Sequence, residues 1–321
     1  MGFNKIMDWN TDKKVVFKEK FVKRYSQLTD FEEFKKYSLE YQKRSIRVNT
    51  LKISVEELRE RLVCNWELTQ IPWCKEGFWI VHKNNERRDI GNTIEHSLGY
   101  YYIQESASMI PAIVLEPKLN EVILDICASP GSKSTQIAQY MDNTGILISN
   151  DYKGDRLAPL GINIQRMGIT NTIMTLMEGR KFKGYNFDRI LLDAPCSGTG
   201  TIRKSFKTIT IWNPDMIKRL ARQQRQLIDS AFMNLKEDGV MVYSTCSLEP
   251  EEDEEVIDFL LSKYQNARLE GIEINIKRSS PILEFEGKSY NPEIRKCLRI
   301  WPQDNNSDGF FVARIRKVSN E

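Results

Sequence analysis

Long apolar runs, paired cysteine motifs and clusters of histidine are missing from this sequence. No apolar stretch among the 321 residues approaches the roughly 18 that a membrane-spanning helix needs. Residues 1–14 lack the apolar core of a secretory signal, so we expect a soluble, cytoplasmic protein with no membrane partner. The six cysteines form no C-x-x-C pair and there are only two histidines, which predicts reduced thiols and no metal site.

A strong charge of one sign is absent as well. The formal net charge is +3, which is too small to identify a nucleic-acid partner by itself. The chain is 40% hydrophobic and 28% charged, as expected of a globular protein, and it is long enough for more than one domain. No internal repeat or low-complexity segment interrupts it. We expect a monomer with two domains, over residues 1–98 and 99–321.

Residues 1–98 are predicted to form a small helical and α/β domain. Aromatic residues at helical spacing predict a helix with an aromatic face buried in the core: Phe31, Phe34, Tyr37 and Tyr41. Three further elements follow, a β-like run over 45–53, a helix over 54–62 and strand-like residues over 71–83. Ser54 and Glu57 fit a capping box at the start of that helix.

From about residue 99 the pattern changes to alternating strands and helices, which predicts an α/β domain with a doubly wound, mostly parallel sheet. Five buried strands are expected, over 122–127, 146–150, 172–176, 187–192 and 240–244. A helix over 214–235 is predicted, with Asn213 as its N-cap and an apolar face formed by Met216, Leu220, Leu227, Ala231 and Leu235. A last strand over 308–317 is expected at the end of the sheet.

The turn after the first of these strands has the features of a ligand site. Residues 125–133 (DICASPGSK) carry small side chains where a strand leads into a helix, so a ligand can approach the backbone and the helix N-terminus closely. Asp151 ends the next strand, where an acid can accept hydrogen bonds from ribose hydroxyls. The pattern fits S-adenosylmethionine (SAM) or NAD, although the G-x-G-x-x-G fingerprint is absent. Asp151 as a simple strand-end cap is the alternative.

Two cysteine-bearing loops offer the reactive groups. Cys196 lies in DAPCSGTG (193–200) and Cys246 in STCS (244–247), each after a predicted buried strand, so both thiols are expected at one edge of the sheet. Carbon 5 of cytosine accepts an electrophilic methyl group only after a nucleophile, such as a thiolate, adds to carbon 6. Asp193 can engage the ring-nitrogen side and stabilise the charge that develops there. From the residues alone, either cysteine qualifies as the nucleophile.

These motifs resemble the Nop/Sun family (RsmB/Nop type) of SAM-dependent RNA cytosine-5 methyltransferases. The resemblance covers roughly residues 47–316 and includes RVN (47–49), QES (104–106), the 125–133 turn, the 193–200 loop, TCS (245–247) and DGFF (308–311). It implies a Rossmann-like class I methyltransferase with a seven-stranded sheet, preceded by a small domain of the RNA-binding type. SAM is the cofactor that it implies, and RNA is the partner.

The resemblance also assigns roles to residues. Cys246 would attack carbon 6, Cys196 would assist product release, and Lys133 would lie beside Asp193 and the target base. The cofactor-binding residues that it implies are Cys127, Ala128, Ser129, Pro130, Gly131, Ser132, Lys133, Asp151, Arg156, Glu178 and Asp193. Among these, Asp151 would hold the ribose and Glu178 would lie near the adenine. The family more often has Asp at the position of Glu178.

Seven acidic residues over 249–258 suggest either a metal site or a helix N-terminus. Because Pro250 and acidic residues suit the first turn of a helix, we favour the helix.

Two other functions compete with RNA cytosine-5 methylation. One is an RNA-binding assembly factor that has lost catalysis, which the intact Cys196, Cys246, Asp193 and Lys133 oppose. The other is methylation of DNA cytosine or of an exocyclic amine, and amine methylation typically uses an Asp/Asn-Pro-Pro-aromatic loop where this chain has DAPC. Among RNA substrates, we expect transfer RNA first and ribosomal RNA second.

Overall fold

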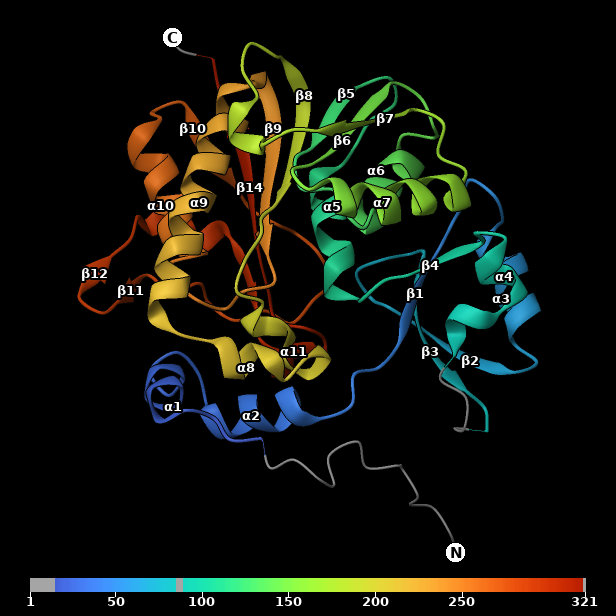
Figure 1. Cartoon of the computed structure of the whole chain (residues 1–321), viewed down its shortest axis with the longest axis horizontal. Coiled ribbons are helices and arrows are strands. Elements are labelled where there is room, and N and C mark those ends of the chain that lie inside the picture. The colour runs from blue at the N-terminus through green and yellow to red at the C-terminus, as the bar shows by residue number, and fades with distance from the viewer. Residues whose placement is uncertain (1–14, 85–88, 320–321) are drawn as a thin grey trace, which may run out of the picture.

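The computed structural model describes residues 15–84 and 89–319. A large sheet with helices on both faces forms most of the molecule, and a small sheet stands beside it (Figure 1). The predicted lack of a secretory signal concerns residues 1–14, which lie outside this description. Within the two described ranges, no helix has the length and apolarity needed to cross a bilayer.

The small sheet is antiparallel, with strand order β2-β3-β1-β4. Its strands are β1 (Ser45–Val48), β2 (Trp66–Gln70), β3 (Gly77–His82) and β4 (Tyr101–Ile103), with helices α3 (Val55–Leu62) and α4 (Ile94–Ser97) beside them. The predicted capping box of α3 is present, with reciprocal bonds between Ser54 and Glu57. β2 was missed because it is an edge strand whose residues are mostly exposed. Because β4 belongs to the small sheet, this sheet extends past residue 98, the predicted domain boundary.

The large sheet has strand order β10-β14-β9-β8-β5-β6-β7, and a short strand, β13, also pairs with β14. All five predicted strands are present, as β5 (Val122–Asp125), β6 (Ile146–Asp151), β7 (Thr172–Leu176), β8 (Phe187–Asp193) and β9 (Leu235–Thr245). β7 is not buried as predicted, because it forms an edge of the sheet and exposes Ile173, Met174 and Leu176. The five strands are parallel to one another. β14 (Phe310–Lys317) runs the opposite way, and it pairs antiparallel with β9, with β10 (Ala267–Glu270) and with β13 (Leu298–Ile300).

The position predicted for the last strand was wrong. β14 lies between β9 and β10 instead of at the end of the sheet. The first four residues of β14 are apolar and buried, so both of its faces need cover. The four-residue strand β10 forms the edge instead, and short strands with charged residues are typical of sheet edges.

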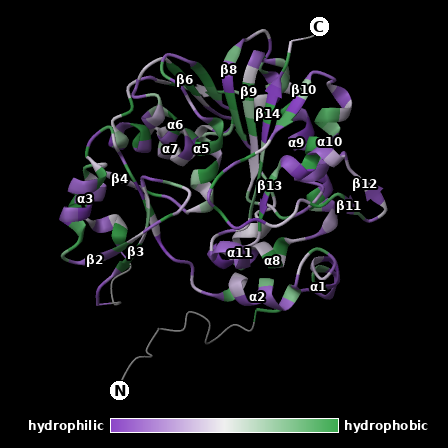
Figure 2. Cartoon of the chain, turned by 180° about the vertical axis from the view of Figure 1, so that it is seen from behind, coloured by the Kyte–Doolittle hydropathy of each residue, from purple (hydrophilic) through white to green (hydrophobic). Residues whose placement is uncertain are grey.

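Neighbouring residues of the central strands point into two different cores. Ile123 and Leu191 pack in a core with helices α5 (Ile110–Leu115) and α6 (Ser132–Tyr140), next to which lies α7 (Gly154–Met167). Leu124 and Ile190 pack on the other face, against α9 (Pro214–Met233) and α10 (Glu254–Lys263). This confirms the doubly wound arrangement. Hydrophilic colour gathers on outlying elements such as α3 and the short strand β12 (Lys288–Ser289), which pairs with β11 (Glu284–Phe285) (Figure 2).

Helix α9 differs from its prediction in its end and in its buried face. It ends at Met233, so Leu235 belongs to β9. Leu227 and Ala231 are buried as predicted, whereas Met216 and Leu220 are only partly buried. The rest of the buried face consists of Ile217, Ala221, Gln224, Ile228, Ser230 and Phe232.

The two N-terminal helices pack on the large sheet's domain and not on the small sheet. α1 (Glu19–Tyr25) and α2 (Phe31–Leu39) lie beneath α8 (Lys207–Ile211) and α11 (Pro302–Asn305) (Figure 1). Phe31 and Phe34 are buried there as predicted, in one core with Trp212 and Trp301. Tyr37 is only partly buried and Tyr41 is half exposed, so the predicted aromatic face is buried only at its start.

The acidic run leads into a helix as predicted, but that helix begins later than expected. The helix, α10, begins at Glu254, four residues later than Pro250 suggested. Glu249, Glu252, Asp253 and Glu254 are fully buried. Arg299 pairs with Asp253 and Glu254, and Arg24 of α1 pairs with Glu249, so these three acids are buried together with cations.

Arg47 of the RVN motif joins the small sheet to the large domain. Its guanidinium is fully buried and donates to the Gln104 side chain at 2.6 Å, the Ser132 carbonyl at 2.8 Å and Thr135 Oγ1 at 3.0 Å. Asn49 makes a second link, because its side-chain amide donates to the Gly99 carbonyl and to the carbonyl of Met167, the last residue of α7. The RVN motif therefore fixes the small sheet relative to the start of α6.

Replacing Arg47 with Met should destabilise the protein by about 2–4 kcal/mol, because three buried acceptors lose their donor. The free energy of unfolding in urea would measure this. Arg44→Met, at an exposed position of the same segment, is the matched control and should change it by less than about 0.5 kcal/mol. Equal effects of the two substitutions would contradict the role given to Arg47.

Candidate active site

The residues predicted to be functional converge at the carboxyl ends of the parallel strands. Asp125, Asp151 and Asp193 end β5, β6 and β8, and Cys246 directly follows β9. Register pairs Asp125 with Ser149 and Asp193 with Ser244, which keeps these strand ends level. The ligand crevice of a doubly wound sheet lies at this edge.

The turn after β5 brings backbone close to this edge. Ala128 N donates to the Asn150 carbonyl at 2.8 Å, and Gly131 N donates to the Ala128 carbonyl at 2.7 Å. Gly131 precedes α6 with φ +104°, and a Cβ there would lie 3.0 Å from Leu160 Cδ1. Glycine is required here by both its conformation and the lack of space.

Asp151 carries a buried oxygen that needs a partner. Its Oδ1 accepts from Lys153 N at 3.2 Å, whereas its Oδ2 is buried without a hydrogen bond. Arg156 Nε lies 3.5 Å from that oxygen, and Arg156 Nη2 donates to the Ser129 carbonyl at 2.7 Å. A buried acceptor without a donor is costly, so this carboxylate is suited to the hydroxyl groups of a ribose.

A cavity of about 530 Å³ opens beside the turn. It is lined by Ile126, Cys127, Tyr152, Glu178, Gly179, Arg180, Pro195, Arg219, Arg222, Gln223, Gln226 and Leu227. Cys127 and Glu178 were predicted near the cofactor. The apolar side chains of Ile126 and Leu227 suit a flat base, so the cavity, the Asp151 carboxylate and the N-terminus of α6 together fit SAM.

Two features of this cavity were not predicted. Helix α9 contributes Arg219, Arg222 and Gln226, and its polar face gave no sign of this in the sequence. Glu178 is paired with Arg180 and Lys181, whose hydrogen bonds lower its pKa, so its carboxylate already has partners.

Lys133 and Asp193 form an ion pair, with Nζ 2.8 Å from Oδ2. Ser244 Oγ donates to the other Asp193 oxygen at 2.8 Å, and Lys133 Nζ also donates to Ser108 Oγ at 3.1 Å. No role was predicted for either serine, although Ser244 lies in the STCS segment (244–247). Nearby, burial raises the pKa of Asp125 to about 7, and Ser134 Oγ donates to this carboxyl at 2.7 Å.

The two cysteines meet as predicted. Their Sγ atoms are 3.3 Å apart, and both residues are partly buried. The hydrogen bond with Cys246 and burial together hold the pKa of Cys196 well above its ordinary value. Cys196 therefore keeps its proton and can donate it to a thiolate on Cys246. Burial also raises the pKa of Cys127 well above the ordinary value for a thiol.

Backbone contacts hold the two cysteine loops together. Ala194 N donates to the Ser244 carbonyl, and Gly200 N donates to the Cys246 carbonyl, each at 2.9 Å. A Cβ on Gly200 would lie 2.2 Å from the Gly309 carbonyl oxygen, so only glycine fits. Gly309 N donates to the Gly200 carbonyl at 2.9 Å, which brings the DGFF motif to the site.

Two family models match the chain. The model for 16S rRNA methyltransferase RsmB/F matches residues 112–316, and the model for the N-terminal domain of 16S rRNA methyltransferase RsmF matches residues 17–106.

Individual proteins are similar over most of the chain. The tRNA (cytosine(49)-C(5))-methyltransferase of Pyrococcus abyssi is 47% identical over 97% of this chain and 99% of its own length. Ribosomal RNA small subunit methyltransferase F of Pectobacterium carotovorum is 43% identical over 87% of this chain, which spans 57% of that enzyme. The crystal structure of a methyltransferase homologue from Pyrococcus horikoshii superposes with a TM-score of 0.84, at 34% identity over 95% of this chain and 96% of that one.

Asp151→Ala should weaken SAM binding about 10- to 100-fold, since hydrogen bonds to a charged acceptor contribute roughly 1.5–3 kcal/mol. Isothermal titration calorimetry with SAM would measure the change. Asp155→Ala, four residues along at an exposed position, is the control and should leave the affinity within about twofold. Equal affinities of the two variants would exclude Asp151 from the ribose site.

Proposed function

This chain belongs to the RsmB/F family of SAM-dependent RNA cytosine-5 methyltransferases, and from this premise we propose that it methylates transfer RNA with Cys246 as nucleophile. The observation that carries the proposed mechanism is the contact between Sγ of Cys246 and Sγ of Cys196 beside the Lys133–Asp193 pair. A pyrimidine in this place can meet a nucleophile, a proton-bearing thiol and a carboxyl group together.

Bound SAM supplies a methyl group made electrophilic by its positive sulfur. The Cys246 thiolate adds to carbon 6 of the cytosine, forming an S–C bond and moving an electron pair toward carbon 5 and the ring nitrogen. Asp193 engages the ring-nitrogen side, where the charge develops, and Lys133 and Ser244 hold its two oxygens in place. Carbon 5 would then take the methyl group as its bond to the cofactor's sulfur breaks, leaving S-adenosylhomocysteine.

Release of the product requires loss of the carbon-5 proton and cleavage of the bond from carbon 6 to sulfur. A water held by Cys196 takes the proton as the base, and the electron pair of the broken C–H bond returns to expel the Cys246 thiolate. The high pKa of Cys196 supports this division of roles, because the thiol that keeps its proton is the poorer nucleophile at the start.

Transfer RNA is favoured by sequence similarity. The Pyrococcus abyssi tRNA enzyme is 47% identical over 97% of this chain, whereas the rRNA enzyme of Pectobacterium carotovorum is 43% identical over 87% of it. Ribosomal RNA is the second candidate, because both family models are named for 16S rRNA enzymes. We propose that residues 1–98 contact the RNA together with the catalytic face, and that the protein acts as a monomer. The target base would be flipped out of its stack to reach the cysteines.

Cys246→Ala should lower kcat by about 10³-fold or more, because the methyl acceptor is no longer activated. Transfer of label from SAM to purified tRNA and to 16S rRNA would measure this, followed by bisulfite sequencing to locate the modified cytosine. Cys64→Ala, at an exposed cysteine, is the control and should retain full activity. Labelled 16S rRNA with unlabelled tRNA would overturn the choice of substrate, and residual activity of Cys246→Ala above a few per cent would exclude it as the nucleophile.

Cys196→Ala should leave Cys246 able to attack but impair release, so that protein remains covalently bound to the RNA. A denaturing gel of enzyme, SAM and RNA would show this as a slowly migrating band. The double variant that also carries Cys246→Ala should lack the band. An inactive Cys196→Ala enzyme without any covalent band would rule out the release role.

A further inference from the structure

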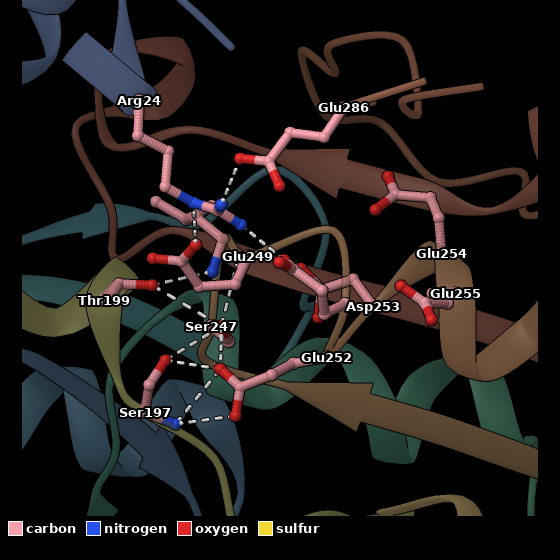
Figure 3. Close-up of polar contacts among 12 residues, drawn as sticks. Arg24, Ser197, Thr199, Ser247, Glu249, Glu252, Asp253, Glu254, Glu255 and Glu286 are labelled. Carbon is pink, nitrogen blue, oxygen red and sulfur yellow. Dashed lines mark hydrogen bonds and ion pairs between the residues drawn. The ribbon is translucent and has the colours of Figure 1, made fainter. Parts of the chain in front are cut away.

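Glu252 is a buried carboxylate that lies between the two cysteine loops (Figure 3). It accepts from Ser197 N at 3.1 Å and from Ser247 Oγ at 2.5 Å, and Ser197 Oγ donates to it as well. Ser197 follows Cys196 and Ser247 follows Cys246. One side chain therefore contacts the residue next to each thiol.

The same carboxylate is linked to the other side of Cys196. Gln224 Nε2 of α9 donates to Glu252 Oε1 at 3.1 Å and to the Pro195 carbonyl at 2.9 Å. Cys196 is thus held at the carbonyl before it and at the N–H after it. The loop itself is rich in small residues, so hydrogen bonds rather than side-chain packing have to fix its shape.

We propose that Glu252 is a positioning residue that keeps Sγ of Cys196 in contact with Sγ of Cys246. This inference rests on the proposed roles of the two cysteines. The geometry around Glu252 supports this role. Its hydrogen-bond donors come from three places: the Cys196 loop, the segment that follows Cys246, and α9. A side chain with two acceptor oxygens can accept from all of them. A glutamine would place an NH₂ group against at least one of these donors.

Glu249 offers a matched comparison. It is equally buried and lies three residues earlier, but its carboxylate accepts from Arg24 at 2.8 Å, Tyr25 at 2.9 Å and Trp212 at 2.8 Å. Figure 3 shows Glu249 beside Arg24 and Glu252 beside Ser197. Its side chain therefore joins α1 to the acidic segment rather than the two cysteine loops to each other.

The test compares E252Q with E249Q in the full chain. Both should melt at a lower temperature than the unaltered protein, because each leaves buried donors without an acceptor. E252Q should lower kcat for tRNA methylation about 30- to 100-fold, as expected for misplaced reacting groups, with KM for tRNA and SAM within about threefold. E249Q should keep kcat within about threefold. E252Q should also carry more RNA in covalent form on a denaturing gel, because release depends on Cys196.

Equal kcat for E252Q and E249Q would overturn the inference and reduce Glu252 to a structural role. Failure of the unaltered protein to methylate any RNA would instead refute the proposed function. If E252Q does not fold, S247A decides, since it removes the link to the Cys246 side and leaves Glu252 bound to Ser197. S247A should lower kcat about fivefold or more, in line with the loss of one hydrogen bond, and an unchanged kcat would overturn the inference.

Discussion

The contact between two thiols depends on holding together two loops that are distant in the sequence. Cys196 and Cys246 are 50 residues apart, yet their Sγ atoms lie within 3.3 Å. Parallel pairing of β8 with β9 brings the loops to one edge of the sheet, and the backbone bonds at Ala194 and Gly200 continue that pairing beyond the strands. In the proposed mechanism one thiol attacks the base and the other assists release, so both loops have to reach the same base.

The contact between the two thiols is supported by residues outside the proposed cofactor site. Gly309 approaches Gly200 at the start of β14, and Glu252 connects the residues that follow the two cysteines. α1 adds an outer layer, because Arg24 pairs with Glu249 and Phe21 packs with Trp212. The N-terminal helices therefore stabilise the acidic segment that follows the Cys246 loop, whereas the small sheet that follows them is attached separately through Arg47.

The proposed sites for cofactor and base lie on different strands of the same sheet. Asp151, at the end of β6, and the turn after β5 lie on the side proposed for SAM, while Asp193 ends β8 and the two cysteines lie in the loops after β8 and β9. Lys133 links these two sides, because its backbone lies at the end of the turn and its Nζ pairs with the Asp193 carboxylate. This division agrees with the family to which the chain belongs, in which one class I methyltransferase domain brings SAM and an RNA cytosine together.

Structural features that depend on the local sequence pattern could be predicted. Apolar runs located the five parallel strands, small residues located the turn, and strand-end motifs gave the cysteines, because hydrophobic periodicity and turn chemistry act over a few residues. Three other features are set by long-range packing and could not be predicted: the position of β14 in the sheet, the docking of α1 and α2 on the large domain, and the part of α9 that lines the cavity. The acidic run shows why. Its composition suits a solvated helix start, but Arg24 and Arg299, from distant parts of the chain, pair with its acids and allow them to be buried. Glu252 is buried by hydrogen bonds from Ser197 and Gln224, which are 55 and 28 residues away, and contacts over such distances leave no periodic trace, so its burial between the cysteine loops could not be predicted.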